Sequence, residues 1–179
     1  MDVDVAEDNS ELASKRRRTD SDHRISIDIS FDGGSRGNPG IAGAGAEVVL
    51  EFKPLGSSPT EKILHVRKFL GRGSTNNVAE YWGVIAALEA ALPHVRSFTK
   101  EIRKGSCAAT VRLRGDSQLV LEQLAGRYRC NDPKLVPLNR QVKTLLKEMN
   151  QQMVTMETSY KHVKREHNSK ADGKYLQQT

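Results

Sequence analysis

Four acidic residues of this 179-residue chain stand where strands or helices are expected to begin or end. They are Asp32, Glu80, Asp116 and Asp172. Each of the two strand-end acids follows an apolar segment, and each of the other two lies near the start of a helical segment. Carboxylates that lie close together repel one another, so a bound cation is their natural compensation. Because no Cys or His cluster accompanies these acids, the oxygen-only set favours a hard ion such as Mg²⁺ or Mn²⁺.

Each carboxylate taken alone also has a simpler interpretation. An Asp-Gly pair such as Asp32-Gly33 after a strand is usually a turn. Glu80, early in a helix, is typical of a residue that interacts with the helix dipole. Asp116 stands where a helix N-cap is common, and Asp172 fits an ordinary surface residue. Composition and periodicity do not choose among these alternatives.

The segments around the acids predict an ordered series of strands and helices. Residues 25–31 alternate apolar and polar side chains, which predicts a strand with one apolar face, and a glycine-rich turn is expected at 33–40. Thr75 is a candidate N-cap, and Pro93 is expected to end the helix that follows it, so that 94–109 form a polar, irregular stretch. Further strands are expected at 41–50, 63–70, 111–115 and 154–163, and helices at 75–92, 117–124, 135–149 and 169–178.

This order, βββ-α-β-α-α-β-α, indicates an α/β fold in which a mixed sheet of five strands is flanked by helices. The first three strands follow one another directly, which favours an antiparallel meander. If the first and fourth strands are neighbours, Asp32 and Asp116 come close together.

Composition narrows the classes of protein that fit. Hydrophobic residues make up 37% of the chain, and the longest apolar stretch, 84–92, is interrupted by Glu89 and is far shorter than the roughly 20 residues of a membrane span. Cys107 and Cys130 form no CxxC pair and no zinc spacing, which excludes a disulfide framework and a structural zinc site and indicates free thiols. The net charge of +6 favours a polyanionic partner.

The first 24 residues differ from the rest in charge. They hold five Lys and Arg against seven Asp and Glu, with almost no large apolar residues, so we expect a disordered charged tail at 1–24 and a catalytic domain at 25–179. The basic run Lys15–Arg18 is a candidate nuclear localisation patch, and a solvated charge cluster is the alternative. The localisation predicted from it is nuclear or cytoplasmic.

Four sequence blocks around the acids occur in a recognisable order. They are DGGSRGNPG at 32–40, TNNVAEYWGVIAALEA at 75–90, RGDSQLVLEQLAG at 114–126 and REHNSKAD at 165–172. Together they closely resemble the type 1 ribonuclease H family, in its compact branch without a basic protrusion or a hybrid-binding domain. The resemblance covers about residues 25–175, and each block supplies one of the acids.

The resemblance implies a ribonuclease H-like fold with helices on both faces of the sheet, and an endonuclease that hydrolyses the RNA strand of RNA–DNA hybrids. It implies two Mg²⁺ ions, for which Mn²⁺ can substitute, and products with 5′-phosphate and 3′-hydroxyl ends. Asp32 would bridge both ions, Glu80 and Asp116 would hold one, and Asp172 the other. The implied partner is the RNA–DNA hybrid, and no association with a membrane is expected. The implied oligomeric state is a monomer.

The resemblance also assigns residues to the substrate. A protein distinguishes RNA from DNA through the 2′-hydroxyl, which both donates and accepts hydrogen bonds. The matching 2′-hydroxyl readers are Asn76 and Asn77, with backbone groups at Gly33, Gly34, Ser35 and Gln118. The matching phosphate contacts are Thr75 and Asn131, with Arg72 as a further candidate and Asn38 as part of the glycine-rich turn. For each asparagine, local capping of the backbone is the alternative.

Two departures from the family pattern concern the end of the chain. The histidine that many members carry before the last helix is matched one step away by His167, which either substitutes for it in catalysis or is a surface residue. Gly173 follows Asp172 where relatives have an apolar helix, and a mid-helix glycine costs about 1 kcal/mol relative to alanine.

Two alternative functions fit the same fold. One is a nucleic-acid-binding module without catalytic activity, and the other is a nuclease that acts on double-stranded RNA.

Overall fold

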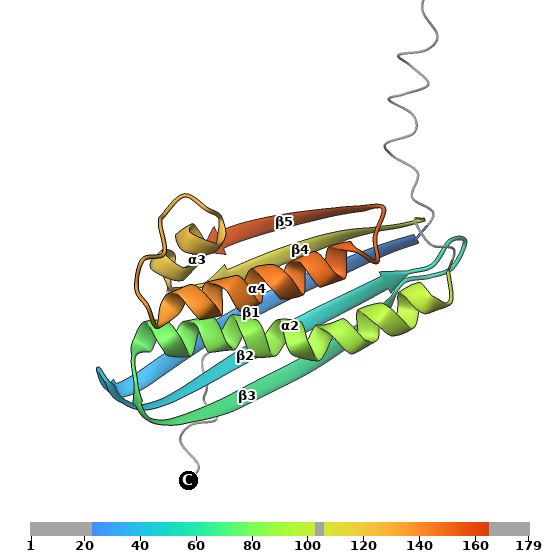
Figure 1. The fold of residues 1–179 in the computed structure, drawn as a ribbon. Helices are drawn as coiled ribbons and strands as arrows, with labels where there is room; N and C mark the ends of the chain where they lie inside the picture. The colour runs from blue at the N-terminus through green and yellow to red at the C-terminus, as the bar shows by residue number, and fades with distance from the viewer. Residues whose placement is uncertain (1–22, 103–105, 165–179) are drawn as a thin grey trace, which may run out of the picture.

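The computed structural model describes residues 23–102 and 106–164 of the chain (Figure 1). The strands are β1 (His23–Gly37), β2 (Gly40–Lys53), β3 (Thr60–Ser74), β4 (Cys107–Gly115) and β5 (Thr155–His162). The helices are α2 (Asn76–Lys100), α3 (Gln118–Leu124) and α4 (Leu135–Asn150). Residues 1–22 of the predicted tail, with the Lys15–Arg18 run, lie outside the described residues, as do the predicted terminal helix and the candidate residues His167, Asp172 and Gly173. His23 and Arg24, which were predicted to end the tail, instead begin β1.

The five strands form one mixed sheet in the order β3-β2-β1-β4-β5. β1, β2 and β3 pair antiparallel, which confirms the predicted meander. β4 pairs parallel with β1, and β5 pairs parallel with β4. The first and fourth strands are therefore neighbours, as the proximity of Asp32 and Asp116 requires.

One face of this sheet forms the core. Ile25, Ile27, Ile29 and Phe31 alternate along β1 and are each at most 2% exposed, because they face the helices. Apolar side chains of α2, α3 and α4 join them in a single cluster, and α2 and α4 run across this face of the sheet (Figure 1). The described helices thus cover the isoleucine face. The predicted helix at 169–178 is not among them.

The glycine-rich segment after Phe31 continues the strand, which corrects the predicted turn at 33–40. β1 stays paired with β2 through Gly37↔Gly40, so only Asn38 and Pro39 make the turn. Backbone pairing does not require side chains, and the neighbouring strand therefore holds the glycines extended. Asp32 accordingly lies within β1 rather than at its end.

Helix α2 does not stop at Pro93, contrary to the sequence prediction. It continues to Lys100, so that residues 94–100 of the predicted irregular stretch at 94–109 are helix and residues 107–109 are strand. An interior proline costs about 3 kcal/mol, because it removes a hydrogen bond and crowds the preceding turn. Packing offsets that cost: Val95 is 0% exposed, and the ring of Phe98 lies 5.1 Å from that of Phe52 on β2.

Among the described residues, no helix is both long enough and apolar enough to cross a membrane, and this includes α2, the longest of them.

Candidate active site

The parallel pairing of β1 and β4 places two of the predicted acids at one edge of the core. The paired register ends at Ser30↔Arg114, and Asp32 and Asp116 each stand two residues beyond that last pair. Glu80 reaches the same place from the second turn of α2, with its side chain only 3% exposed. Three elements that are distant in sequence therefore bring three carboxylates together.

One oxygen from each of Asp32, Glu80 and Asp116 lies within 4.8 Å of the other two. Oδ1 of Asp116 is buried and has no hydrogen-bond partner within the described part of the chain. Buried polar atoms without partners are costly, and clustered carboxylates repel, so this donor set fits a hard divalent cation. The simpler interpretation of Asp116 as a helix cap is wrong, because Ser117 is the N-cap residue of α3.

Two glycines allow the elements that carry these acids to approach closely. A Cβ on Gly33 would lie 2.2 Å from the carbonyl carbon of Ala79 and 2.3 Å from the nitrogen of Glu80. A Cβ on Gly115 would lie 2.6 Å from the ring of Phe31. These distances are far below van der Waals contact, so any other residue would push α2 away from β1 or displace the end of β4.

A second group of predicted residues gathers where the β1–β2 turn meets the start of α2. The backbone N–H of Asn76 donates to Oδ1 of Asn38 at 3.2 Å. The Ser35 hydroxyl donates to the carbonyl of Ser74 at 2.9 Å. Thr75 is the N-cap of α2, as predicted, and its Oγ1 accepts from the N–H of Val78 at 3.4 Å. The turn and the helix start are thus tied into one surface, and capping accounts for part of what Asn38 and Thr75 do.

The remaining predicted substrate residues lie on separate segments. Gly34 is on β1 next to Gly33, and Asn77 is the second residue of α2. Gln118 is the first residue of α3, two positions after Asp116. Arg72 lies on β3, two residues before Ser74, and Asn131 is exposed in the loop between α3 and α4. Neither is one of the three clustered acids.

The structure adds His162 to the surroundings of the acids. This residue ends β5, and its Nε2 lies 3.1 Å from the backbone carbonyl oxygen of Asp116. The contact follows from the register, because Gly115 pairs with His162 across β4 and β5. It depends on β4 and β5 being neighbours, which local sequence patterns do not specify.

The structure also shows a buried polar network next to Glu80 that the sequence patterns do not predict. The Tyr81 hydroxyl donates to Oε1 of Gln123 at 2.9 Å and accepts from Nδ2 of Asn139 at 2.9 Å. Gln123 Nε2 in turn donates to the carbonyl of Arg129 at 3.3 Å, in the loop that contains Asn131. Burial raises the pKa of Tyr81 well above its usual range, so its hydroxyl stays protonated and keeps donating.

Comparison with known proteins identifies relatives of this chain in sequence and in fold. A family model described as reverse transcriptase-like matches residues 30–173. The N-terminal RNase H domain of Rv2228c from Mycobacterium tuberculosis, solved as a fusion with maltose binding protein, is 34% identical with a TM-score of 0.59, and the match covers 82% of this chain and 93% of that one. RNase H1 from Halobacterium salinarum is 33% identical with a TM-score of 0.56, over 82% of this chain and 92% of that one.

Together, these matches and the mixed five-stranded sheet define the class of protein as an α/β protein with a ribonuclease H-like fold. The chain belongs to the ribonuclease H-like, reverse transcriptase-like family.

The full-length relatives are longer than the region that the chain matches. The bifunctional protein Rv2228c of Mycobacterium tuberculosis is 34% identical over 148 residues, which are 83% of this chain but 34% of that protein. Ribonuclease HI of Halobacterium salinarum is 37% identical over 142 residues, which are 79% of this chain and 58% of that protein. The chain therefore spans about a third of the first relative and somewhat over half of the second.

Proposed function

We propose that this chain is an endonuclease that hydrolyses the RNA strand of RNA–DNA hybrids. The observation that carries the proposal is the cluster of Asp32, Glu80 and Asp116, with oxygens within 4.8 Å of one another at the meeting point of three elements. Membership of the ribonuclease H-like family supports the same reaction and the same substrate class.

The three clustered carboxylates would hold divalent cations, for which we propose two Mg²⁺ ions with Mn²⁺ as a substitute. Asp172, in the matching block at 165–172, would complete the ligand set. Bound cations at such sites stabilise charge on the phosphate oxygens and lower the pKa of an attacking water. The products would carry 5′-phosphate and 3′-hydroxyl ends.

The chain's own residues would position the hybrid. Asn76 and Asn77 open α2, where backbone N–H groups and the helix dipole favour a phosphate. Their amide side chains can donate to and accept from a 2′-hydroxyl, which DNA lacks. The hydrogen bond between Asn38 and Asn76 holds the β1–β2 turn against this surface, so the turn and the helix start can contact the same strand.

The test is cleavage of a labelled hybrid of about 20 base pairs with Mg²⁺, beside matched double-stranded RNA and double-stranded DNA. We expect cleavage of the RNA strand of the hybrid alone, and loss of cleavage with EDTA. Cleavage of the double-stranded RNA would favour a nuclease of broader specificity. Hybrid binding without cleavage, with either Mg²⁺ or Mn²⁺, would favour the inactive binding module.

Replacement of one acid tests the site itself. Asp32→Asn removes a charge at nearly constant size and should abolish cleavage while largely retaining hybrid binding, because the amide is a poorer cation ligand. Asp28→Asn is the matched control on the same strand face. Asp28 pairs with Arg112 and Arg114 at 2.8 Å rather than with the acidic cluster, so this variant should still cleave. Equal cleavage by Asp32→Asn and the wild type would remove Asp32 from the site.

A further inference from the structure

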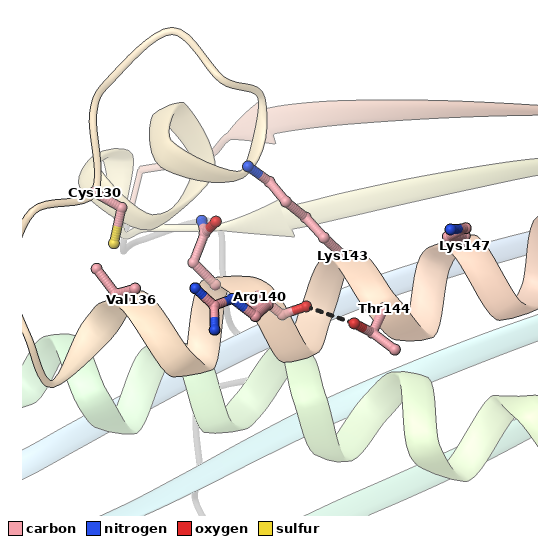
Figure 2. Close-up of a pocket in the computed structure, with 7 residues that line it drawn as sticks. Cys130, Val136, Arg140, Lys143, Thr144 and Lys147 are labelled. Carbon is pink, nitrogen blue, oxygen red and sulfur yellow. Dashed lines mark hydrogen bonds between the residues drawn. The ribbon is translucent and has the colours of Figure 1, made fainter.

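A groove separate from the acidic cluster runs along α4, on the side of the loop that follows α3 (Figure 2). Its volume is about 370 Å³, and three basic residues of α4, Arg140, Lys143 and Lys147, line it. Cys130 of the loop and Asn139 of the helix also line it. We call this feature the α4 groove.

The basic residues of the α4 groove are not neutralised by ion pairs with acids among the described residues. Within the described part of the chain, no ion pair joins Arg140, Lys143 or Lys147 to a carboxylate. The acid that follows them, Glu148, pairs instead with Arg96 of α2. Arg127 pairs with Glu122, and the residues that follow it, 128–147, contain five Lys and Arg and a single acid, Asp132. Such a surface attracts a polyanion.

The spacing of the three cations suits a nucleic-acid strand. Residues separated by three and four positions share one face of a helix, so Arg140, Lys143 and Lys147 form a row. Because an α-helix rises 1.5 Å per residue, the row is about 10 Å long. That length corresponds to about three nucleotides, because each strand of a duplex carries one phosphate for about every 3.4 Å of its axis. Figure 2 shows Lys143 extending from α4 on the side of α3, with Arg140 and Lys147 on either side of it along the helix.

One residue that lines the α4 groove is also the chain neighbour of a residue that the resemblance assigns to the substrate. Cys130 precedes Asn131, the residue that matches a phosphate contact of the DNA strand. Asn139, which also lines the groove, donates to the Tyr81 hydroxyl, and Tyr81 follows Glu80 in α2. A strand held at Asn131 would therefore reach Arg140 first and the two lysines next.

We propose that the α4 groove is a second nucleic-acid site, which binds phosphates of the DNA strand of the hybrid outside the cleavage site. This proposal rests on the proposed function for its substrate. The groove would contribute binding energy without touching the scissile phosphate, so its loss should raise KM and leave kcat nearly unchanged.

The test compares two double variants of equal charge. Lys143→Ala with Lys147→Ala removes two groove cations. The control, Lys53→Ala with Lys62→Ala, removes two exposed lysines near the Arg24↔Lys53 end of the sheet, away from Asp32. All four lysines are exposed, so thermal unfolding should show both variants folded.

Affinity for a hybrid of about 20 base pairs is measured in EDTA over a range of salt concentrations, so that the result does not depend on cleavage. We expect the groove variant to bind on the order of 10-fold more weakly at about 0.1 M salt. The slope of log K against log salt should fall by about 0.9 for each phosphate that the variant no longer binds, whereas the control should match the wild type.

Neutral methylphosphonate linkages identify the strand. Placed in the DNA strand outside the cleavage site, they should weaken binding of the wild type but not that of the groove variant. The proposal is overturned if the groove variant binds like the control, or if only neutral linkages in the RNA strand matter. Failure of the proposed function is distinguishable, because it would appear as absent cleavage by the wild type in Mg²⁺.

Discussion

At the scale of single residues, the acidic cluster depends on residues with no side chain as much as on the acids. Gly33 faces the backbone of α2 at Ala79 and Glu80, so the helix can lie directly on β1 beside Asp32. Gly34, its neighbour, has no atom within 4 Å of a would-be Cβ. Adjacent glycines thus have different roles, and only the first sets the position of an acid.

We expect Gly33→Ala to lower the free energy of unfolding by about 1 to 3 kcal/mol, because overpacking forces the backbone to shift. It should also reduce kcat for hybrid cleavage, since α2 carries Glu80 away from the other acids. Urea unfolding and cleavage assays measure the two effects. Gly34→Ala is the control for stability and should unfold like the wild type; equal stability of the two variants would contradict the close approach.

At the scale of elements, α2 connects the substrate surface to the rest of the fold. Its first residue, Asn76, donates to Asn38 in the β1–β2 turn. Tyr81, further along the helix, joins α3 and α4 through Gln123 and Asn139. The same network holds the carbonyl of Arg129. The loop with Asn131 and the helix with Glu80 are therefore positioned by one set of buried hydrogen bonds.

Tyr81→Phe tests this network. It leaves Gln123 Oε1 without its donor and Asn139 Nδ2 without its acceptor, and unsatisfied buried groups cost about 1 to 3 kcal/mol each. We expect a loss of unfolding free energy of that order in chemical denaturation. Tyr128→Phe, at a side chain that is 48% exposed, should change it by less than about 0.5 kcal/mol. A Tyr81→Phe variant as stable as Tyr128→Phe would show that the network contributes little.

For the molecule as a whole, the order of strands in the sheet brings the acids together. The folded structure must therefore be stable enough to hold three carboxylates close together despite their mutual repulsion. β4 follows α2 in sequence but pairs beside β1, which places Asp116 next to Asp32. Part of the free energy that the core supplies offsets the repulsion of three carboxylates held within 4.8 Å. A bound cation would therefore act on the stability of the whole domain.

Divalent metal should stabilise the folded chain apart from any effect on cleavage. A ligand that binds only the folded state at ten times its Kd adds about 1.4 kcal/mol, which is about 3 to 6 °C in Tm for a domain of this size. We expect Mg²⁺ to raise Tm of the wild type and of Asp28→Asn, and not that of Asp32→Asn. In EDTA, Asp32→Asn should be at least as stable as the wild type, because one repulsion is removed; a lower Tm there would argue against strain in the cluster.

Local patterns in the sequence were enough for part of the fold. The alternation from Ile25 to Phe31 predicts a strand with one buried face, and the cap at Thr75 predicts the start of α2 to within a residue. The order of the described strands and helices was also predicted and is confirmed, and the structure brings Asp32, Glu80 and Asp116 together as expected. The two wrong boundaries, at Pro93 and in the glycine-rich segment, are places where a residue's intrinsic preference yields to packing.

Local sequence patterns were sufficient to single out the candidate acids, the N-cap of α2 and the order of the described elements, because side-chain periodicity and capping act between residues a few positions apart. The tertiary structure decided the length of α2 and β1, the contact of His162 with Asp116, the Tyr81 network and the row of cations in the α4 groove. Each of these depends on the pairing of strands or the packing of helices distant in sequence, which local preference does not specify.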